Sequence, residues 1–502
     1  MLDPLDWRGN ELLREAPETN AAGTATDTPA LLQPKATLRE RVAAVLRQEH
    51  RRWFTLLGVV EFLALTALAA LAPGFAETPV PSHPFGAVLF AALLSVNLLV
   101  LGLYQRHQRE ISSTRATVLV RIALAAAIAA PELLVLDALF PTAQLVAGPL
   151  TWTLPLAGLF LVASRFVFAR VLRAAGIKRR VLFLGAGSRA ALALGRMRRE
   201  QDRRGVDVVG FVPLKGETVA VDQARLRLPL ADLVRHALAS RIDEIVIAAD
   251  DRRGALPMQA LLRCRELGIG VIEVEAFCER ELERVSLELV QPSWFVFADL
   301  RDAALLRRIS KRGFDLVVAS MLLLLTAPLM GLVALAILIE SRWRGPVLYV
   351  QERVGLNDRP FALYKFRSMR TDAEMDGVAR FASADDARIT RVGRVIRKTR
   401  LDELPQLWNV LRGEMSIVGP RPERPPFVER FKHNVPYYSL RHCVSPGLTG
   451  WAQLRFPYGA SEADAVEKLR YDLYYVKNHG LVFDLMVLLQ TVEVVLFGRG
   501  AR

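Results

Sequence analysis

Five long apolar runs limit what this chain of 502 residues can fold into. Four of them follow one another, at residues 53–71, 85–104, 118–140 and 150–168, and the fifth covers residues 314–339. A helix of about 20 apolar residues crosses the hydrocarbon core of a bilayer, and each run is near that length. We therefore expect a membrane α/β protein that has a four-helix transmembrane bundle over residues 53–172.

The distribution of charge predicts how this bundle is oriented. The net charge is +14, which would also suit a nucleic-acid-binding protein. However, the linkers at residues 73–84 and 141–149 contain no Lys or Arg, whereas those at 105–115 and 169–180 are basic. By the positive-inside rule, both ends of the bundle are cytoplasmic. We expect a multi-pass membrane protein with no nucleic-acid partner.

Residues 1–52 precede the bundle. The first part is rich in Ala, Thr and Pro without periodicity, which predicts disorder, and the second part is basic. The segment has no early apolar run, so we expect no cleavable signal peptide. Glu61 lies within the first apolar run, where a carboxylate is costly unless it faces the bundle. It could serve function there or pack against a polar partner.

Residues 177–298 alternate between strand-like and helical patterns. RRVLFLGAG, VDVVGFV, IDEIVIAAD and GVIEVEAF read as strands, which predicts a Rossmann-like module with a parallel sheet. Gly185 and Gly187 belong to a turn that fits the G-x-G-x-x-A pattern of dinucleotide-binding loops. The second strand does not end in the acidic residue that would bind a ribose hydroxyl. We therefore favour a structural or regulatory module over a nucleotide site.

The fifth apolar run is long enough to cross a membrane, yet two features oppose a simple span. Basic residues flank it on both sides, with Lys311 and Arg312 before it and Arg342 and Arg344 after it. Both ends should therefore be cytoplasmic. Pro328 lies near the centre of the run, where proline removes a helix hydrogen bond. We expect a re-entrant helix hairpin over residues 314–340 that turns at Pro328. Residues 481–497 are predicted to form an interfacial helix.

The stretch from Arg397 to Pro425 places adjacent acids, Asp402 and Glu403, among many basic residues. Two adjacent carboxylates suit phosphoryl chemistry, one as nucleophile and one as metal ligand. The acids could equally occupy the first turn of a helix, where they favour the dipole. Two further clusters contain candidate polar side chains, which are Gln351, Arg353, Lys365, Arg367, Trp451 and Gln453. The histidines and the three cysteines show no metal-site spacing.

From about Lys311 onwards the chain resembles the bacterial sugar transferase family, the monotopic polyprenyl-phosphate hexose-1-phosphate transferases. The resemblance rests on KRGFD, GPVLYVQERVGL, YKFRSM, DELPQLWNVLRGEMSIVGPRPE and PGLTGWAQ. It implies a mostly α cytoplasmic catalytic domain over residues 308–502. The preceding bundle and α/β module resemble the long form of the family, the undecaprenyl-phosphate glucose or galactose phosphotransferases. The C-terminal sequence is most similar to the exopolysaccharide enzymes found with exosortase systems.

The resemblance also implies roles for individual residues. Asp402 matches the nucleophile that takes hexose 1-phosphate from a UDP-hexose and releases UMP, and Glu403 matches the ligand of Mg²⁺. Pro328 matches the proline of the membrane hairpin, although Ala327 stands where the family often has Ser. The residues that match phosphate-binding positions, or lie in a basic motif around the same site, are Arg397, Arg421, Lys365 and Arg367.

These inferences predict a transferase of the bacterial cytoplasmic membrane that begins exopolysaccharide synthesis. Its substrates would be UDP-hexose and undecaprenyl phosphate, with Mg²⁺ as cofactor. A homo-oligomer and downstream glycosyltransferases are the expected protein partners. The alternative is a membrane-bound, nucleotide-sensing regulator whose transferase domain is inactive. The sequence does not indicate which hexose is transferred.

Overall fold

The computed structural model of the protein describes residues 50–71, 84–100, 103, 115–139, 150–174, 178–197, 205–222, 224–251, 256–290, 305–371, 386, 388–456 and 461–497. Two sets of sequence-based predictions lie outside these residues. One concerns the N-terminal segment up to residue 49. The other concerns most of the linkers whose charges predict the orientation of the first four apolar runs.

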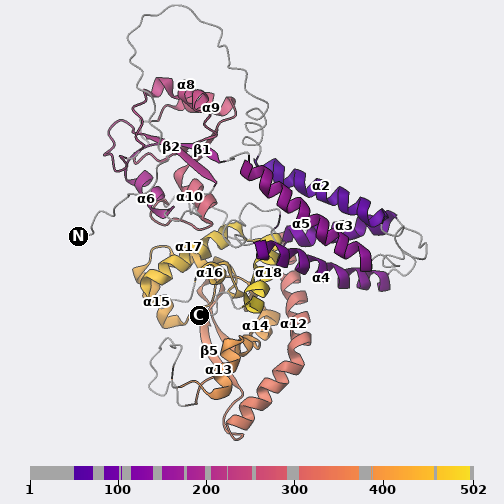
Figure 1. Ribbon diagram of the computed structural model, residues 1–502. Coiled ribbons are helices and arrows are strands. Elements are labelled where there is room, and N and C mark those ends of the chain that lie inside the picture. Colours follow the sequence, from indigo (N-terminus) through magenta and orange to yellow (C-terminus); the bar gives the residue numbers. More distant parts are fainter. Residues whose placement is uncertain are drawn as a thin grey trace, which may run out of the picture. The chain divides into compact units, whose positions relative to one another are not determined.

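The first four apolar runs form helices with a shared core (Figure 1). These are α2 (His50–Leu71), α3 (Pro84–Val100), α4 (Arg115–Leu139) and α5 (Leu150–Ala174). Each contributes fully or almost fully buried residues, including Leu65, Leu94, Ala125 and Leu161. Other apolar residues, such as Leu63 and Leu159, are exposed. A helix that is apolar on all sides suits a buried core or a membrane.

Glu61 packs against a polar partner within this group of helices. Arg165 Nη2 lies 2.7 Å from Glu61 Oε2, and Ser164 donates its hydroxyl to Glu61 Oε1 at 2.6 Å. Arg165 Nη1 also donates to the carbonyl oxygen of Leu103. The carboxylate that would be costly in hydrocarbon is therefore paired between α2 and α5.

Residues 178–290 contain a parallel sheet in the order β2-β1-β3-β4. Its strands are β1 (Arg179–Leu184), β2 (Val206–Val212), β3 (Glu244–Ile247) and β4 (Gly270–Glu273). The accompanying helices are α6 (Ser188–Arg196), α8 (Leu233–Ala239), α9 (Met258–Glu266) and α10 (Val274–Leu282). The predicted parallel α/β module is confirmed in this part of the chain.

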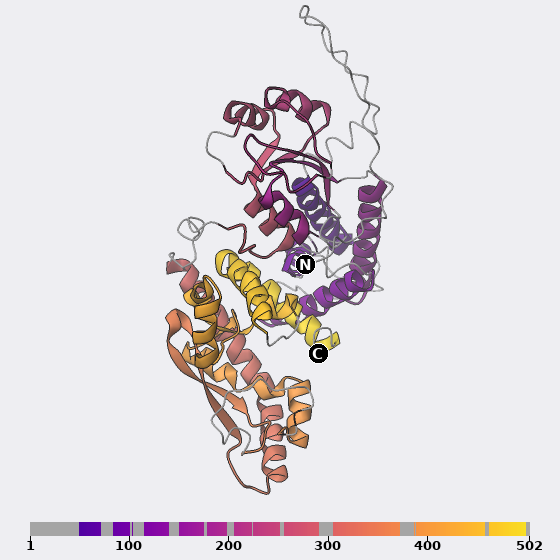
Figure 2. The same cartoon turned by 90° about the vertical axis from the view of Figure 1, so that its left-hand side faces the viewer.

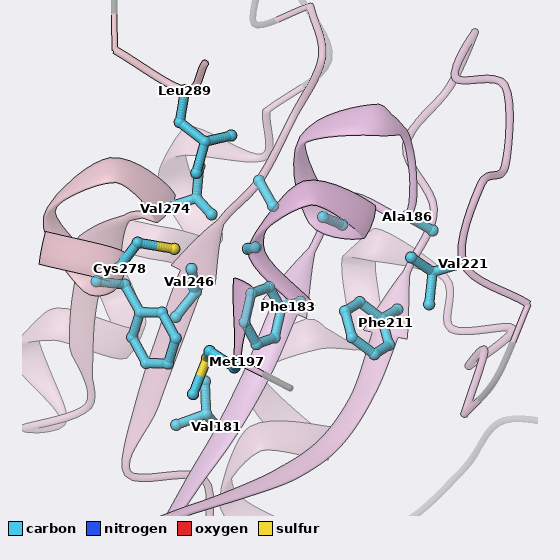
Figure 3. Close-up of a cluster of buried hydrophobic side chains, with 14 of the residues drawn as sticks. Val181, Phe183, Ala186, Met197, Phe211, Val221, Val246, Val274, Cys278 and Leu289 are labelled. Carbon is cyan, nitrogen blue, oxygen red and sulfur yellow. The ribbon is translucent and has the colours of Figure 1, made fainter. Parts of the chain in front are cut away.

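Alternating side chains of β1 enter two different cores. Phe183 packs with Phe211 and Phe277 on the side of α6 and α10 (Figure 3), whereas Leu182 packs with Leu233 on the side of α8 and α9. This period of two is what a strand buried on both faces requires. One boundary differs from the prediction. The strand in GVIEVEAF ends at Glu273, and α10 begins at Val274, because the apolar residues that follow cover one helix face.

The fifth apolar run lies within α12 (Leu305–Glu340), one continuous helix of 36 residues. The predicted hairpin turn at Pro328 is therefore wrong: the helix bends but does not break (Figure 1). Proline removes a single backbone donor, and the packing of both halves keeps the helix continuous. Among the described helices, α12 alone has the length and hydropathy to cross a membrane; α2, α3 and α5 contain shorter apolar stretches.

Both halves of α12 pack against the elements that follow it. Ala319 of the first half is buried with Leu407, and Ile337 of the second half is buried with Ile396. On the outer side, Leu324 and Leu325 are 80% and 74% exposed, which leaves an apolar face without a protein partner among the described residues.

Both ends of the apolar run within α12, residues 314–339, are fixed to these same elements. Asp315 accepts hydrogen bonds from the Ser416 hydroxyl at 2.9 Å and the Ile417 amide at 3.0 Å. At the other end, Glu340 accepts from the amides of Arg391 and Val392 at 2.7 and 3.1 Å. A straight span would place the two ends of α12 on opposite faces of a membrane, whereas here both ends bind one group of elements.

That group combines two small sheets with short helices. β5 (Leu348–Val354) pairs antiparallel with β6 (Pro360–Phe366), and β7 (Ser416–Val418) pairs parallel with β8 (Gly447–Thr449). The helices are α13 (Arg391–Lys398), α14 (Gln406–Arg412), α15 (Pro425–Asn434), α16 (Trp451–Arg455), α17 (Glu462–Asn478) and α18 (Leu481–Phe497). The side chains of Ser461 and Asp464 cap the start of α17 in a capping box.

The last helix, α18, contributes to the core. Met486 and Val487 are buried there, so one side of α18 faces protein; the interfacial position expected of this helix stays a prediction. Asp484 of α18 is completely buried and lies 2.6 Å from Lys311 Nζ of α12. It also accepts a hydrogen bond from the Tyr475 hydroxyl at 2.7 Å.

Removal of Asp484 should test this contact. Asp484→Ala leaves the Lys311 ammonium buried without its counter-ion, so we expect the free energy of unfolding to fall by about 3–5 kcal/mol. The measurement is thermal unfolding of the detergent-solubilised protein. Glu462→Ala removes the exposed ion pair with Arg430 and serves as the control, with almost no change in Tm. Equal Tm values for the two variants would contradict the anchoring role.

Candidate active site

The acidic pair lies on a tight turn between two helices. The residue before the turn, Arg400, has a φ of 60°, in the left-handed region that non-glycine residues rarely adopt. A 3-10 turn over Leu401–Glu403 follows, and α14 begins only at Gln406, without a side-chain cap. The two acids therefore occupy the first turn of this short 3-10 helix, ahead of α14, and not the first turn of an α-helix. Both carboxyl side chains are buried.

Glu403 is held by cations from three parts of the chain. Arg421, which follows β7, forms a two-pronged pair with the carboxylate, at 2.7 Å to Oε1 and 3.3 Å to Oε2. Lys365 of β6 and Arg400 lie 3.8 and 3.7 Å from Oε1. Burial alone raises the pKa of Glu403, but Arg421 and Lys365 outweigh it, and the pKa lies well below its ordinary value. Glu403 is thus an anion at neutral pH.

The lysine in this cluster is itself perturbed. Burial of the Lys365 ammonium lowers its pKa to about 8, with Glu403 acting in the opposite direction and Arg421 and Arg353 adding to the decrease. Lys365 is therefore still mostly charged at neutral pH, but it loses its proton more readily than an exposed lysine.

Asp402 is placed differently from its neighbour. Its Oδ1 atom is buried and has no hydrogen-bond partner among the described residues. Burial raises the pKa of Asp402, and the adjacent Glu403 charge raises it further, against the opposing effect of Lys365, Arg397 and Arg421. A carboxylate that is poorly solvated and not used by its own protein is suited to attack a substrate or to bind a cation.

The donor set can be tested against Mg²⁺. Mg²⁺ binds oxygen ligands and is commonly held by one or two carboxylates together with substrate phosphates and water. Glu403, an anion next to the Asp402 carboxylate, supplies a ligand of this kind. The described part of the chain contains no group of three or more His, Cys, Asp or Glu that would form a complete protein site.

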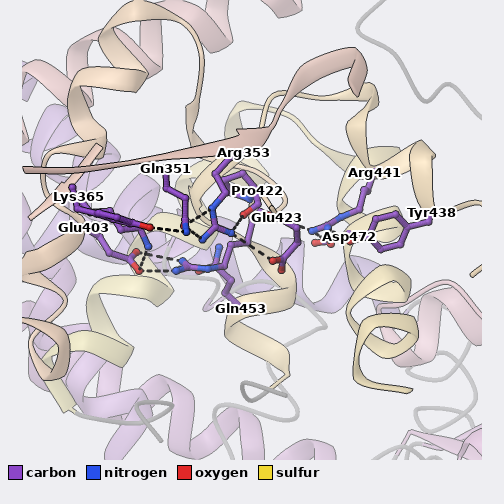
Figure 4. A network of polar contacts seen from close by, with 12 residues as sticks. Gln351, Arg353, Lys365, Glu403, Pro422, Glu423, Tyr438, Arg441, Gln453 and Asp472 are labelled. Atoms are coloured by element: carbon purple, nitrogen blue, oxygen red, sulfur yellow. Dashed lines mark hydrogen bonds and ion pairs between the residues drawn. The ribbon is translucent and has the colours of Figure 1, made fainter. Parts of the chain in front are cut away.

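Figure 4 shows how these residues continue into a larger polar network. Glu403 and Lys365 lie at one end, and Arg353 and Gln351 of β5 lie near the middle. Arg353 donates to the Gln351 side chain at 2.6 Å and to the Pro422 carbonyl at 2.9 Å. Gln453 of α16 approaches from the third sequence cluster, with Oε1 3.5 Å from Arg421 Nη1.

The other residues selected from the sequence have distinct surroundings. Arg397 is half-buried on the last turn of α13 and contributes to the electrostatic field at Asp402. Arg367 does not join the acidic pair: its guanidinium donates to the carbonyl of Arg344, in the turn after α12, at 3.2 Å. Trp451 is buried, and its indole N–H donates to the carbonyl of Glu283 at 3.0 Å, as expected for a packing residue.

The glycine turn of the α/β module is filled by two of its own carboxylates. Asp250 Oδ2 accepts from the Ser188 amide at 2.8 Å, and Oδ1 accepts from the Arg189 amide at 2.9 Å. Glu217 Oε2 accepts from the Ala186 amide at 3.0 Å. These amides, in the glycine turn and at the start of α6, are the donors that would bind a nucleotide phosphate in such a loop. A Cβ on Gly187 would lie 2.2 Å from Asp250 Oδ2, so no room is left beside it.

Comparison with known proteins assigns the family. Residues 306–498 match the model of the bacterial sugar transferase family. The UDP-N-acetylgalactosamine-undecaprenyl-phosphate N-acetylgalactosaminephosphotransferase of Aeromonas hydrophila is 47% identical over 192 residues, 38% of this chain and 45% of that protein. The undecaprenyl-phosphate glucose phosphotransferase of Komagataeibacter xylinus is 35% identical over 331 residues, 65% of this chain and 60% of that protein.

A third relative is similar over most of its length. The UDP-glucose:undecaprenyl-phosphate glucose-1-phosphate transferase of Escherichia coli (strain K12) is 34% identical over 328 residues, 64% of this chain and 68% of that protein. The chain belongs to the bacterial sugar transferase family. It spans 45% and 60% of the first two relatives; the name of the first contains N-acetylgalactosamine, and the names of the other two contain glucose.

The filled glycine turn makes a prediction about ligands. NAD⁺ should not raise the Tm of the full-length protein, because Asp250 and Glu217 occupy the amides that its diphosphate would need. Asp250→Ala should lower stability by about 1 kcal/mol, the usual cost of a lost helix cap. Asp222→Ala, at an exposed position of the same module, is the control. A rise in wild-type Tm with NAD⁺ that saturates would contradict this interpretation.

Proposed function

We propose that this protein transfers hexose 1-phosphate from a UDP-hexose to undecaprenyl phosphate and releases UMP, as the first step of exopolysaccharide synthesis. The observation that carries the proposal is the buried Asp402 carboxylate, with one oxygen unused, next to a Glu403 that is locked by Arg421. Membership of the sugar transferase family and the names of its relatives support the same reaction.

The reaction proceeds in two displacements at one phosphorus atom. The Asp402 carboxylate attacks the β-phosphorus of the UDP-hexose, and the bond from that phosphorus to the bridging oxygen breaks. UMP leaves with the bridging oxygen and its electron pair. An oxygen of undecaprenyl phosphate then attacks the aspartyl phosphosugar, and the Asp402 carboxylate is released unchanged. Covalent catalysis of this kind replaces one difficult encounter with two easier ones.

The surrounding residues have separate roles. Arg421, Arg397 and Lys365 neutralise the phosphates, and Arg421 also fixes the orientation of Glu403. Glu403 would hold Mg²⁺, which supplies positive charge to the diphosphate when it is bound. Arg367 is assigned to the turn after α12, because Arg344 already engages its guanidinium.

We place the reaction at the cytoplasmic face of the bacterial inner membrane, with α2, α3, α4 and α5 as transmembrane helices. The exposed apolar side of α12, bent at Pro328, enters the bilayer, while both of its ends remain with the catalytic elements. This arrangement brings a lipid phosphate and a soluble nucleotide sugar to one site. We further assign the protein to the exosortase-associated branch, on the basis of its C-terminal sequence.

The nucleotide product tests the reaction. Purified protein given UDP-hexose, Mg²⁺ and undecaprenyl phosphate should form UMP in step with a lipid-linked diphosphosugar, and Asp402→Asn should abolish both. Glu429→Gln, at an exposed position of α15, is the control and should retain wild-type activity. Formation of UDP, or turnover by the Asp402→Asn protein, would refute the proposed chemistry.

The proposed Mg²⁺ site makes a separate prediction. Metal-depleted protein should form no UMP until Mg²⁺ is restored. Glu403→Gln removes the carboxylate that would hold the metal ion, so the Mg²⁺ concentration for half-maximal rate should rise. The increase should be at least about 10-fold, which is the smallest effect typical of residues that contact a metal only indirectly. A wild-type Mg²⁺ dependence in Glu403→Gln would remove Glu403 from the site.

A further inference from the structure

The turn that carries Arg421 has an unusual hydrogen-bonding problem. It runs Val418-Gly-Pro-Arg-Pro-Glu423, and its two prolines provide no backbone donors. Buried carbonyl oxygens must nevertheless find donors, because an unpaired one is costly. The backbone meets only part of this need: the Gly447 amide donates to Pro420 and the Val354 amide donates to Glu423, at 2.9 and 3.0 Å.

Three other carbonyl oxygens of this turn accept hydrogen bonds from side chains. Val418 O accepts from Tyr475 at 2.9 Å and Lys311 at 3.2 Å, and Pro422 O accepts from Arg353 at 2.9 Å. The carbonyl of Arg421 itself accepts from Arg441 Nη2 at 2.9 Å. Arg421 therefore binds Glu403 through its side chain and Arg441 through its backbone.

Arg441 is fixed by partners on other elements. It is 4% exposed, and its Nη2 atom also lies 2.8 Å from Asp472 Oδ2 of α17, which is 2% exposed. Its Nη1 atom donates to the Tyr438 hydroxyl at 2.7 Å, and the guanidinium lies over the Tyr438 ring at 5.1 Å from the centroid. Figure 4 shows this trio at the end of the network opposite Glu403.

A buried Arg–Asp pair is a poor source of stability. Removing two charges from water costs several kcal/mol each, and apolar residues of similar volume often serve as well. The pair can, however, hold a donor at a defined place, because a guanidinium fixed by a carboxylate has little freedom left. Here the Arg441 guanidinium donates to the backbone carbonyl of Arg421, the residue whose side chain binds Glu403.

We propose that Arg441 and Asp472 are positioning residues for the transfer reaction. They fix the Arg421 backbone, and thereby the placement of the Arg421 guanidinium against Glu403 beside Asp402. Neither residue forms a hydrogen bond or ion pair with Asp402 or Glu403 in the described structure. The inference rests on the proposed function in one respect: it takes from it that Arg421 and Glu403 belong to the reacting centre.

The test removes the donor without leaving a buried charge. The double variant Arg441→Met with Asp472→Leu should still fold, because both charges of the pair are replaced, with a modest fall in Tm because the Arg421 carbonyl loses its donor. Its kcat for UMP release should fall by about 100-fold, the effect of a displacement of about 1 Å in a catalytic group. Arg470→Met is the control, since Arg470 is buried on α17 like Asp472 but pairs with Glu467 and Glu288, away from the turn.

A mutant cycle separates positioning from general structure. In an Arg421→Ala background the same double variant should cause no further loss of kcat, because the group that it positions is gone. An equal loss in both backgrounds, or wild-type kcat in the double variant alone, overturns the proposal. If the double variant does not fold, Arg441→Lys replaces it; this variant keeps the charge near Asp472 without the two-pronged donor, and wild-type kcat would again refute the role.

The single variants distinguish this inference from the proposed function. Full activity of both Arg421→Ala and Glu403→Gln would show that the reacting centre lies elsewhere. If both variants lose activity, and the Arg441 change lowers kcat by the same factor with and without Arg421, the proposed reaction stands and only the positioning role is rejected.

Discussion

The pair between Glu403 and Arg421 is the interaction on which the rest of the site depends. Glu403 is buried, and burial by itself favours the protonated form of a carboxylate. Arg421 meets it with two hydrogen bonds, so that Glu403 stays charged and Asp402 is left as the carboxylate with an unused oxygen. Two chemically similar neighbours thereby become different groups: Glu403, the proposed ligand of Mg²⁺, is an anion held in place, and Asp402 is the proposed nucleophile.

The backbone around the pair is organised to keep this difference. Arg400 adopts a left-handed conformation before the 3-10 turn, and Arg421 stands on a turn whose carbonyls are bound by side chains from distant elements. Strain and buried charge both cost stability, and they occur together at functional sites. The hydrophobic contacts of α12 with α13 and α14 stabilise the fold around the site and offset these local losses of stability.

The sequence predicts the members of the site better than it predicts their contacts. Asp402 and Glu403 stand out as an acidic pair in a basic stretch, and local pattern also indicates the parallel sheet and the apolar helices. Arg441 and Asp472 could not be found in this way, because α17 and the turn of Arg421 are brought together only by packing. The same holds for Asp250, whose carboxylate fills a glycine turn more than sixty residues earlier in the chain.

Two local predictions needed correction for related reasons. Pro328 removes one hydrogen bond from α12, and the packing of both helix halves outweighs that loss, so the helix bends without breaking. The apolar residues after Glu273 look like a continuing strand, but their burial against Phe183 and Val246 is that of a helix face. In both cases tertiary contacts decided what the local pattern left open.

Mass spectrometry of the intact protein and its peptides tests the central claim most directly. Protein incubated with UDP-hexose and Mg²⁺ in the absence of undecaprenyl phosphate should gain the mass of one hexose phosphate, on the peptide that contains Asp402. Addition of undecaprenyl phosphate should then remove it. A modification on Glu403 or on any other residue would contradict the assignment of Asp402 as the reactive carboxylate. So would protein that gains no adduct without undecaprenyl phosphate and yet converts UDP-hexose fully once the lipid is added.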